Sequence, residues 1–161
     1  MTRTAYADTN VAVWRSQEQI RNLLSKLNVV GVRSTFFSGV GMLEFVRNTK
    51  GGTRLPYRIV VTPKVNKDTQ NPVKELDRAE RQVWRVVYWW LKAKVEALDF
   101  GLVEFEQEFL PYMMLQDRQG HESTVAQAFF ESMAGRLAAG NDPFAGLRPA
   151  LPEGDKATSG E

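Results

Sequence analysis

One long segment of the chain has a clear helical pattern: residues Val73–Leu98, which read VKELDRAERQVWRVVYWWLKAKVEAL. Apolar side chains recur in it every three to four positions, as on the buried face of an amphipathic helix; they are Leu76, Ala79, Val83, Val87 and Trp90. A polar loop at 66–72 ends in Asn71-Pro72 before this segment, and Gly101 follows it as a typical stop. We therefore predict one continuous helix over Val73–Leu98.

The opposite side of this helix carries a stripe of positive charge. At about 100° per residue, five cations and one indole fall within an arc of roughly 80°; they are Lys74, Arg78, Arg81, Arg85, Trp89 and Lys92. The nearby acids Glu75, Asp77 and Glu80 fall outside that arc. Solvated helix faces usually alternate both signs one turn apart, so sorted charges indicate an anionic partner such as nucleic acid. The alternatives are that the acidic second half of the chain covers the stripe, or that the stripe simply faces water.

Three strand patterns precede the long helix, at Val29–Phe37, Gly41–Arg47 and Arg54–Val65. They are rich in β-branched and aromatic residues, and the connections between them are short. Gly51-Gly52 in the second connection is a hairpin signal. We predict an antiparallel three-stranded meander, with the proline-containing third strand at an edge.

Two further helices are predicted on either side of these elements. Residues 14–27 place apolar side chains on one helical face, with Ser16 as the N-cap and Asn28 closing the helix, and Thr124–Leu137 reads as a last helix. The fold class is thus α+β: a small antiparallel three-stranded meander packed on one long helix, with flanking N- and C-terminal helices. We expect a loose N-terminus at 1–11, a single domain at 12–139 and a disordered tail at 140–161, where glycine and proline are frequent.

Composition excludes several classes of protein. The chain has 161 residues and no cysteine, which rules out disulfides, zinc–thiolate sites and thiol catalysis. No apolar run approaches the ~20 residues of a membrane span, so we expect a cytoplasmic protein without a membrane partner. Residues 1–98 hold 17 Lys and Arg against 8 Asp and Glu, a balance of +9, while residues 99–161 hold 4 against 11, a balance of −7. This asymmetry suggests either a polyanion-binding part or two halves that pair with each other.

A second basic feature lies at the predicted hairpin tip, where Arg47, Lys50 and Arg54 accompany two glycines. Flexible basic hairpins can follow a nucleic-acid backbone or enter a groove. The alternative is an ordinary hydrophilic turn with protective charges.

Residues that could carry catalysis are few. Glu104, Glu106 and Glu108 could hold a divalent metal from one face of a strand, but the surrounding phenylalanines favour a short helix with a solvated acidic face. His121 is the only histidine, and no partner for a general base is recognisable near it. Phosphate-binding loops, dinucleotide-binding glycine patterns and nucleophile elbows are absent from the sequence. We expect no enzyme, no cofactor and no metal.

One part of the sequence is similar to a known group of proteins. The stretches Arg81-Gln-Val-Trp-Arg and Leu91-Lys-Ala-Lys-Val-Glu-Ala-Leu-Asp-Phe-Gly-Leu, with Phe105-Glu-Gln-Glu-Phe-Leu-Pro, resemble a family of small proteins encoded in tailed-phage and prophage genomes. The likeness covers roughly residues 12–133, and the chain departs from it at Gln116–Gly120, where a shorter Pro-Asp-Gly turn is expected. The resemblance implies a viral origin and a role inside the infected host cell. It transfers no catalytic residues, because no activity is established for the family.

These observations lead to two main functional hypotheses, with a virion or assembly component as a third. The first is a non-enzymatic phage protein that binds single-stranded DNA or RNA in replication, recombination or annealing. Phage annealing proteins also place a meander against a helix, which is an analogy of fold only. The second is a module that inhibits or redirects a host enzyme through the acidic stretch from Asp99 to Glu131. Long helices with exposed aromatic residues also occur in homo-oligomers, but the sequence locates no interface.

The tail gives a first testable prediction. Deleting residues 146–161 should leave the melting temperature unchanged within about a degree or two, because this stretch has almost no large apolar side chain to contribute to a core. Thermal unfolding followed by circular dichroism measures this. If the shortened chain no longer unfolds cooperatively, the tail must pack.

Overall fold

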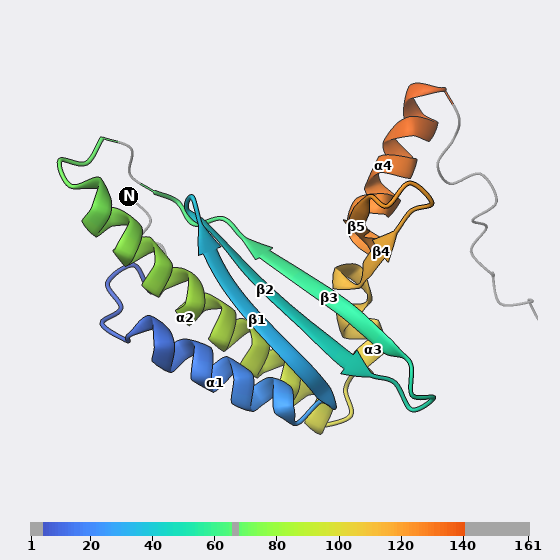
Figure 1. The fold of residues 1–161 in the computed structure, drawn as a ribbon, viewed down its shortest axis with the longest axis horizontal. Helices are drawn as coiled ribbons and strands as arrows, with labels where there is room; N and C mark the ends of the chain where they lie inside the picture. Colours follow the sequence, from blue (N-terminus) through green and yellow to red (C-terminus); the bar gives the residue numbers. More distant parts are fainter. Residues whose placement is uncertain (1–4, 66–67, 141–161) are drawn as a thin grey trace, which may run out of the picture. The chain divides into compact units, whose positions relative to one another are not determined.

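The computed structural model describes residues 5–65 and 68–140, and Figure 1 shows their arrangement. The elements, in chain order, are α1 (Val13–Ser25), β1 (Val29–Phe37), β2 (Val40–Asn48), β3 (Arg54–Val61), α2 (Pro72–Asp99), α3 (Phe105–Phe109), the 3-10 turn η1 (Leu110–Tyr112), β4 (Met114–Gln116), β5 (Glu122–Thr124) and α4 (Val125–Ala138). The α+β class, the meander, the long helix and the two flanking helices are confirmed. The chain divides into two compact units, Met1–Ala126 and Gln127–Glu161. The expected tail falls almost wholly at 141–161, outside the described residues.

The meander is antiparallel throughout, in the order β1-β2-β3. Leu43 lies opposite Ile59 and Phe45 opposite Tyr57, and all four are buried on one face. The third strand ends at Val61, four residues earlier than predicted, ahead of Pro63, which cannot donate a ladder hydrogen bond. Pro56 is accommodated within β3 because that strand is at the edge of the three-stranded sheet.

The helices α1 and α2 lie on the same face of this sheet, and the other face carries no helix of the first unit (Figure 1). Val83 and Val87 of α2 are buried in the shared core, as predicted. The buried arc of α2 is wider than the sequence pattern indicates, because α1 packs along it and also buries Trp84, Leu91 and Val95.

Two residues of the predicted core face of α2 lie elsewhere. Trp90 is only half-buried and meets Phe109 and Tyr112 edge-on, with ring centroids 6.1 and 5.5 Å apart. It therefore packs on α3 and η1 and not across the sheet. Leu76 is 40% exposed, because it lies in the first turns of α2, near the β1–β2 turn at Gly39.

Local signals set most helix ends. The Asn71 side chain accepts a hydrogen bond from the Lys74 backbone N–H, and Pro72 follows in the first turn of α2. Asn28 and Gly101, with φ of 57° and 69°, end α1 and α2 in the left-handed region. The prediction of Ser16 as an N-cap is wrong: α1 begins at Val13, which packs on the core, and Ser16 is fully buried inside the first turn.

The short hairpin β4–β5 includes a strand that the sequence pattern did not predict. A turn at Asp117–Gly120 joins its two strands, and Gly120 takes a φ of 88° there. An isolated bridge between Tyr57 and Met113 attaches the hairpin to the free edge of β3. In the second unit, Phe129, Phe130 and Leu137 of α4 are exposed. None of the described helices combines the length and the apolar character that crossing a bilayer requires.

Gly41 gives a prediction about the contact between sheet and helix. A Cβ atom added at Gly41 would lie 2.5 Å from Cγ1 of Val83, so in Gly41→Ala the side chain of Val83 or the backbone around it must shift. Overpacking of this kind costs about 1–3 kcal/mol of unfolding free energy, measurable by urea denaturation. Gly31→Ala is the matched control, since a Cβ there meets nothing within 4 Å. Equal stability of the two variants would contradict this packing.

Candidate nucleic-acid interface

Three cations of the predicted stripe on α2 form ion pairs within their own helix. Arg78 reaches Glu75 at 2.6 Å, Arg81 reaches Asp77 at 3.0 Å and Lys92 reaches Glu96 at 3.7 Å. The expectation that charges on this helix are sorted is therefore wrong. Helical position alone placed the acids off the stripe, but long side chains reach across an arc of the helix to neighbours three or four residues away.

Arg78 is the most strongly held of these cations. The hydrogen bonds that Arg78 donates to the Glu75 carboxylate raise the pKa of Arg78 further above its usual range, against the opposing effect of burial. It also donates to the backbone oxygen of Ala7 and to the side chain of Gln82. A phosphate at Arg78 would have to displace protein partners.

Arg85, Trp89 and Lys92 form an aromatic–cation cluster on the stripe. The Arg85 guanidinium lies 5.1 Å and the Lys92 ammonium 4.9 Å from the centroid of the Trp89 ring, and Arg85 also lies over Tyr88. Trp89 is 37% exposed. Arg85 donates to the amide oxygen of Gln19 on α1, and no carboxylate in the described part of the chain pairs with it. This aromatic–cation cluster can offer positive charge and a π surface together.

The N-terminal segment, expected to be loose, lies against this stripe from residue 5 onward. Tyr6 stacks near Trp89 with an interplanar angle of 8° and a centroid distance of 6.4 Å. Gln82 donates to the backbone oxygen of Ala5. Tyr6 itself has a φ of 58°, in a turn closed by a hydrogen bond from Thr9 N–H to its carbonyl. The segment thus covers the middle of the stripe with a ring and two carbonyl oxygens.

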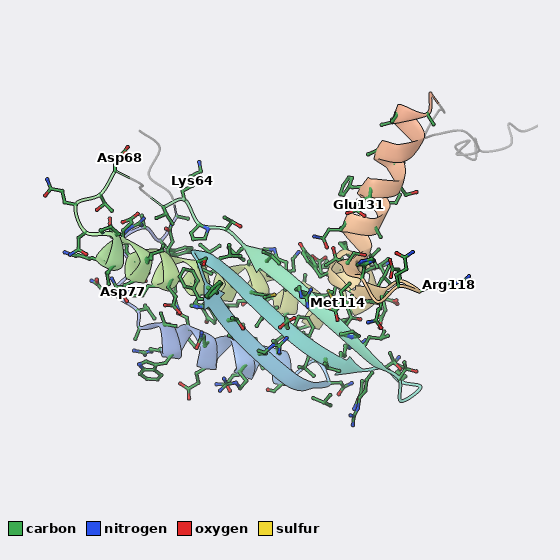
Figure 2. The ribbon with its side chains drawn as sticks, turned by 45° about the horizontal axis from the view of Figure 1, so that its top comes forward. Lys64, Asp68, Asp77, Met114, Arg118 and Glu131 are labelled. Atoms are coloured by element: carbon green, nitrogen blue, oxygen red, sulfur yellow. The ribbon has the colours of Figure 1, made fainter. Side chains whose placement is uncertain are left out.

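Lys74 lies at the beginning of α2, on the rim of a polar recess of about 290 Å³. Ala7–Asn10 of the N-terminal segment form one wall, and Glu75, Arg78 and Arg81 line the other. Lys74 is exposed and has no ion pair within residues 5–65 and 68–140. Asp77, the partner of Arg81, is labelled near the same end of the helix in Figure 2.

The three cations of the hairpin tip have different environments. Arg47 is 13% exposed: it donates to the Leu27 carbonyl and to Glu106, and its guanidinium lies 3.9 Å from the Phe105 ring centroid. Lys50 and Arg54 are exposed. No hydrogen bond or ion pair of the described residues joins this tip to the α2 stripe.

The basic and acidic halves of the chain do meet, although not at the stripe. Glu106 binds Arg47, Glu108 binds Lys94 and Glu122 binds Arg58. The Arg47 hydrogen bond is the main reason that the pKa of Glu106 lies below its usual range. These pairs use three of the acids in the Asp99–Glu131 stretch and none of the cations of the stripe.

The residues considered for catalysis have structural partners. Glu104 caps α3 together with Gln107. His121 does have a neighbouring acid, contrary to expectation: its Nδ1 lies 3.1 Å from Asp117, but both side chains are exposed on the hairpin turn. Among the described residues, no group of three or more histidine, cysteine, aspartate or glutamate side chains could hold a metal ion.

Sequence reasoning missed a charged row on the open face of the sheet. Glu44 accepts hydrogen bonds from Arg33 on β1 and Arg58 on β3, and Arg58 continues to Glu122 on β5. Burial raises the pKa of Glu44, but the two arginines outweigh it and the pKa is lowered. The row borders a hollow of about 440 Å³. The alternation of side chains along each strand places Arg33, Glu44 and Arg58 on one face of the sheet. Which of them lie opposite one another depends on the strand register.

Arg47 and Arg54 allow a direct test of which hairpin cations are structural. Arg47→Ala should lower the free energy of unfolding by roughly 1–3 kcal/mol, because it removes a charged hydrogen bond and leaves the Leu27 carbonyl without this donor. Arg54→Ala, in the same hairpin but exposed, should change it by less than about 0.5 kcal/mol. Urea denaturation of both variants provides the comparison, and a small effect at Arg47 would show that its contacts are not stabilising.

Comparison with known proteins adds no assignment to this geometry. No protein-family model, no curated protein and no solved structure matches the chain. The function therefore has to be argued from the contacts and charges of this chain's own residues.

Proposed function

We propose that the protein binds single-stranded nucleic acid through the exposed face of α2, with Arg85, Trp89 and Lys92 at the centre of the site. The observation that supports this most directly is the aromatic–cation cluster. Two cations lie about 5 Å from a partly exposed indole, and one of them, Arg85, has an amide oxygen as its hydrogen-bond partner among the residues that the structure describes. Phosphate oxygens are better acceptors for a guanidinium than a neutral amide, because both partners are then charged.

The arrangement along the helix suits a phosphate backbone. Arg81 and Lys92, with Arg85 between them, are 11 positions apart on α2, which corresponds to roughly 16 Å of helix length. The ion pairs of Arg81 with Asp77 and of Lys92 with Glu96 lie at the surface and are weak, so phosphates can compete with them. Lys74 can extend the path at the beginning of the helix. Arg78 and Arg47 contribute less, because each makes several hydrogen bonds within the protein.

The indole favours single strands over duplex. An exposed ring can stack on a base only if that base is unpaired, and such stacking contributes about 1–3 kcal/mol per base without strong sequence preference. Tyr6, 42% exposed and near-parallel to Trp89, can widen the stacking surface. A non-enzymatic role in phage replication, recombination or annealing would follow from binding of this kind.

The rival hypothesis, a host-protein inhibitor with an acidic docking surface, has less support from the geometry. Glu106, Glu108 and Glu122 are bound to cations of the same chain. A basic partner would have to break these pairs before it could use those carboxylates.

Salt dependence tests the proposal. Binding to a fluorescent single-stranded oligonucleotide, followed by anisotropy, should weaken linearly in log–log form as salt rises, with a slope of about −0.7 per neutralised phosphate. The double change Arg81→Ala/Arg85→Ala should flatten the slope by roughly one to two units. Trp89→Ala should weaken binding at every salt concentration without changing the slope, because stacking releases no counterions.

A matched control is Lys64→Ala/Arg118→Ala, which removes the same charge from exposed positions that do not belong to the stripe. It should leave the slope unchanged. Absence of binding at about 50 mM salt, where phosphate contacts are strong, would end the proposal, and so would a slope that the arginine changes do not alter. The host-protein hypothesis would then take first place.

A further inference from the structure

The free edge of β1 is long and unprotected. In the described part of the chain β1 pairs only with β2, so along Val29–Phe37 the backbone groups that point away from β2 have no strand partner. Natural sheets usually block such edges with proline, several charges or a covering segment. β1 has no proline and one charged residue, Arg33, and a recess of about 190 Å³ opens between α1 and its first half.

The strand also fits a second copy of itself. In an antiparallel pair the two residues that lie opposite each other are on the same face of the sheet. If two β1 strands meet about a twofold axis at Ser34, then Val32 lies opposite Phe36 of the partner on the core side. On the open side Arg33 lies opposite Thr35 of the partner. The next register, centred on Arg33, would oppose two arginines directly and is disfavoured.

In the same register, the most exposed aromatic side chain of the sheet lies opposite a residue of the partner that leaves room for it. Phe37 is 77% exposed, and its opposite residue in the partner strand is Gly31. Gly31 and Phe37 both belong to the open face, and the space beside Gly31 is empty to 4 Å. Gly31 also borders the 440 Å³ hollow, together with Val46, Pro56 and Met114. A cavity of about 150 Å³ holds benzene, so a phenyl ring has room there.

We infer that the protein forms a twofold symmetric dimer through antiparallel pairing of two β1 strands about Ser34, in which Phe37 of each copy covers Gly31 of the other. The two meanders then form one continuous six-stranded sheet. The pairing is isologous, so it closes after two copies and leaves no further β1 edge for growth. It does not use the α2 face, and the dimer places two such faces in one particle.

The first test is the mass in solution of the full-length chain, by sedimentation over a roughly hundred-fold concentration range, since a dimer responds to dilution. The unmodified chain should sediment as a dimer that dissociates at low concentration. Gly31→Lys should give a monomer, because a long charged side chain then occupies the site of the partner's Phe37, and Phe37→Ser should weaken the dimer at least ten-fold. Phe100→Ser is the matched control: Phe100 is 82% exposed and far from β1 in sequence, and its change should leave the dimer intact.

A second test reads the register directly and does not depend on a destabilised variant. The chain has no cysteine, so Ser34→Cys introduces one thiol per copy. Directly opposed residues of an antiparallel pair have Cα atoms about 4.5–5.5 Å apart, within the range that a disulfide spans. Mild oxidation should link two copies through Cys at position 34, while the exposed control Thr53→Cys should stay largely unlinked.

The outcomes separate clearly. A chain that is monomeric at every concentration overturns the inference, as does a dimer that survives Gly31→Lys, because another surface must then hold it. Absence of the Ser34→Cys link in a dimeric protein overturns the register. None of these results bears on nucleic-acid binding by α2, which is measured separately by the salt titration.

Discussion

The burial of α2 between α1 and the meander is the packing arrangement on which the rest of the structure depends. Because α1 packs on this helix as well as the sheet, Trp84, Val87 and Leu91 are almost fully removed from water. Burial of large apolar side chains contributes about 1.5–3 kcal/mol each. What remains of the helix surface is one narrow face, and every cation of the stripe must lie on it. The candidate interface is therefore a consequence of the core.

The electrostatics of this face show why net charge is a poor guide to a site. The first 98 residues carry an excess of nine positive charges, yet most of the predicted cations have a partner in the folded chain. Arg47 and Arg78 are held by hydrogen bonds and partly buried, whereas Arg81 and Lys92 have exposed partners that a ligand can replace. The useful distinction is between cations that stabilise the protein and cations that remain available.

Much of the fold could be predicted from the sequence, because its signals are local. The alternating pattern of Leu43 and Phe45, the spacing of Val83 and Val87, and Asn71-Pro72 each depend on near neighbours only. What could not be predicted depends on tertiary contacts. The sequence pattern makes Ser16 an N-cap candidate, and only the packing of Val13 on the core shows that the helix begins earlier. By its helical position Glu75 lies off the stripe, and only the structure shows that its side chain pairs with Arg78. The stacking of Tyr6 near Trp89 brings together residues 83 positions apart, and no pattern in the sequence predicts it.

The central claim, that a single strand binds on the α2 face, can be tested residue by residue with the indole N–H signals of the tryptophans in a ¹⁵N-labelled sample. Trp89→Phe assigns its signal by absence, and an unlabelled oligothymidine is then titrated into the unmodified protein. We expect a progressive shift of the Trp89 signal, while the signal of Trp84, fully buried in the core, stays in place. If the Trp89 signal does not move at saturating oligonucleotide, or only that of the exposed Trp14 on α1 does, the α2 face is not the binding site.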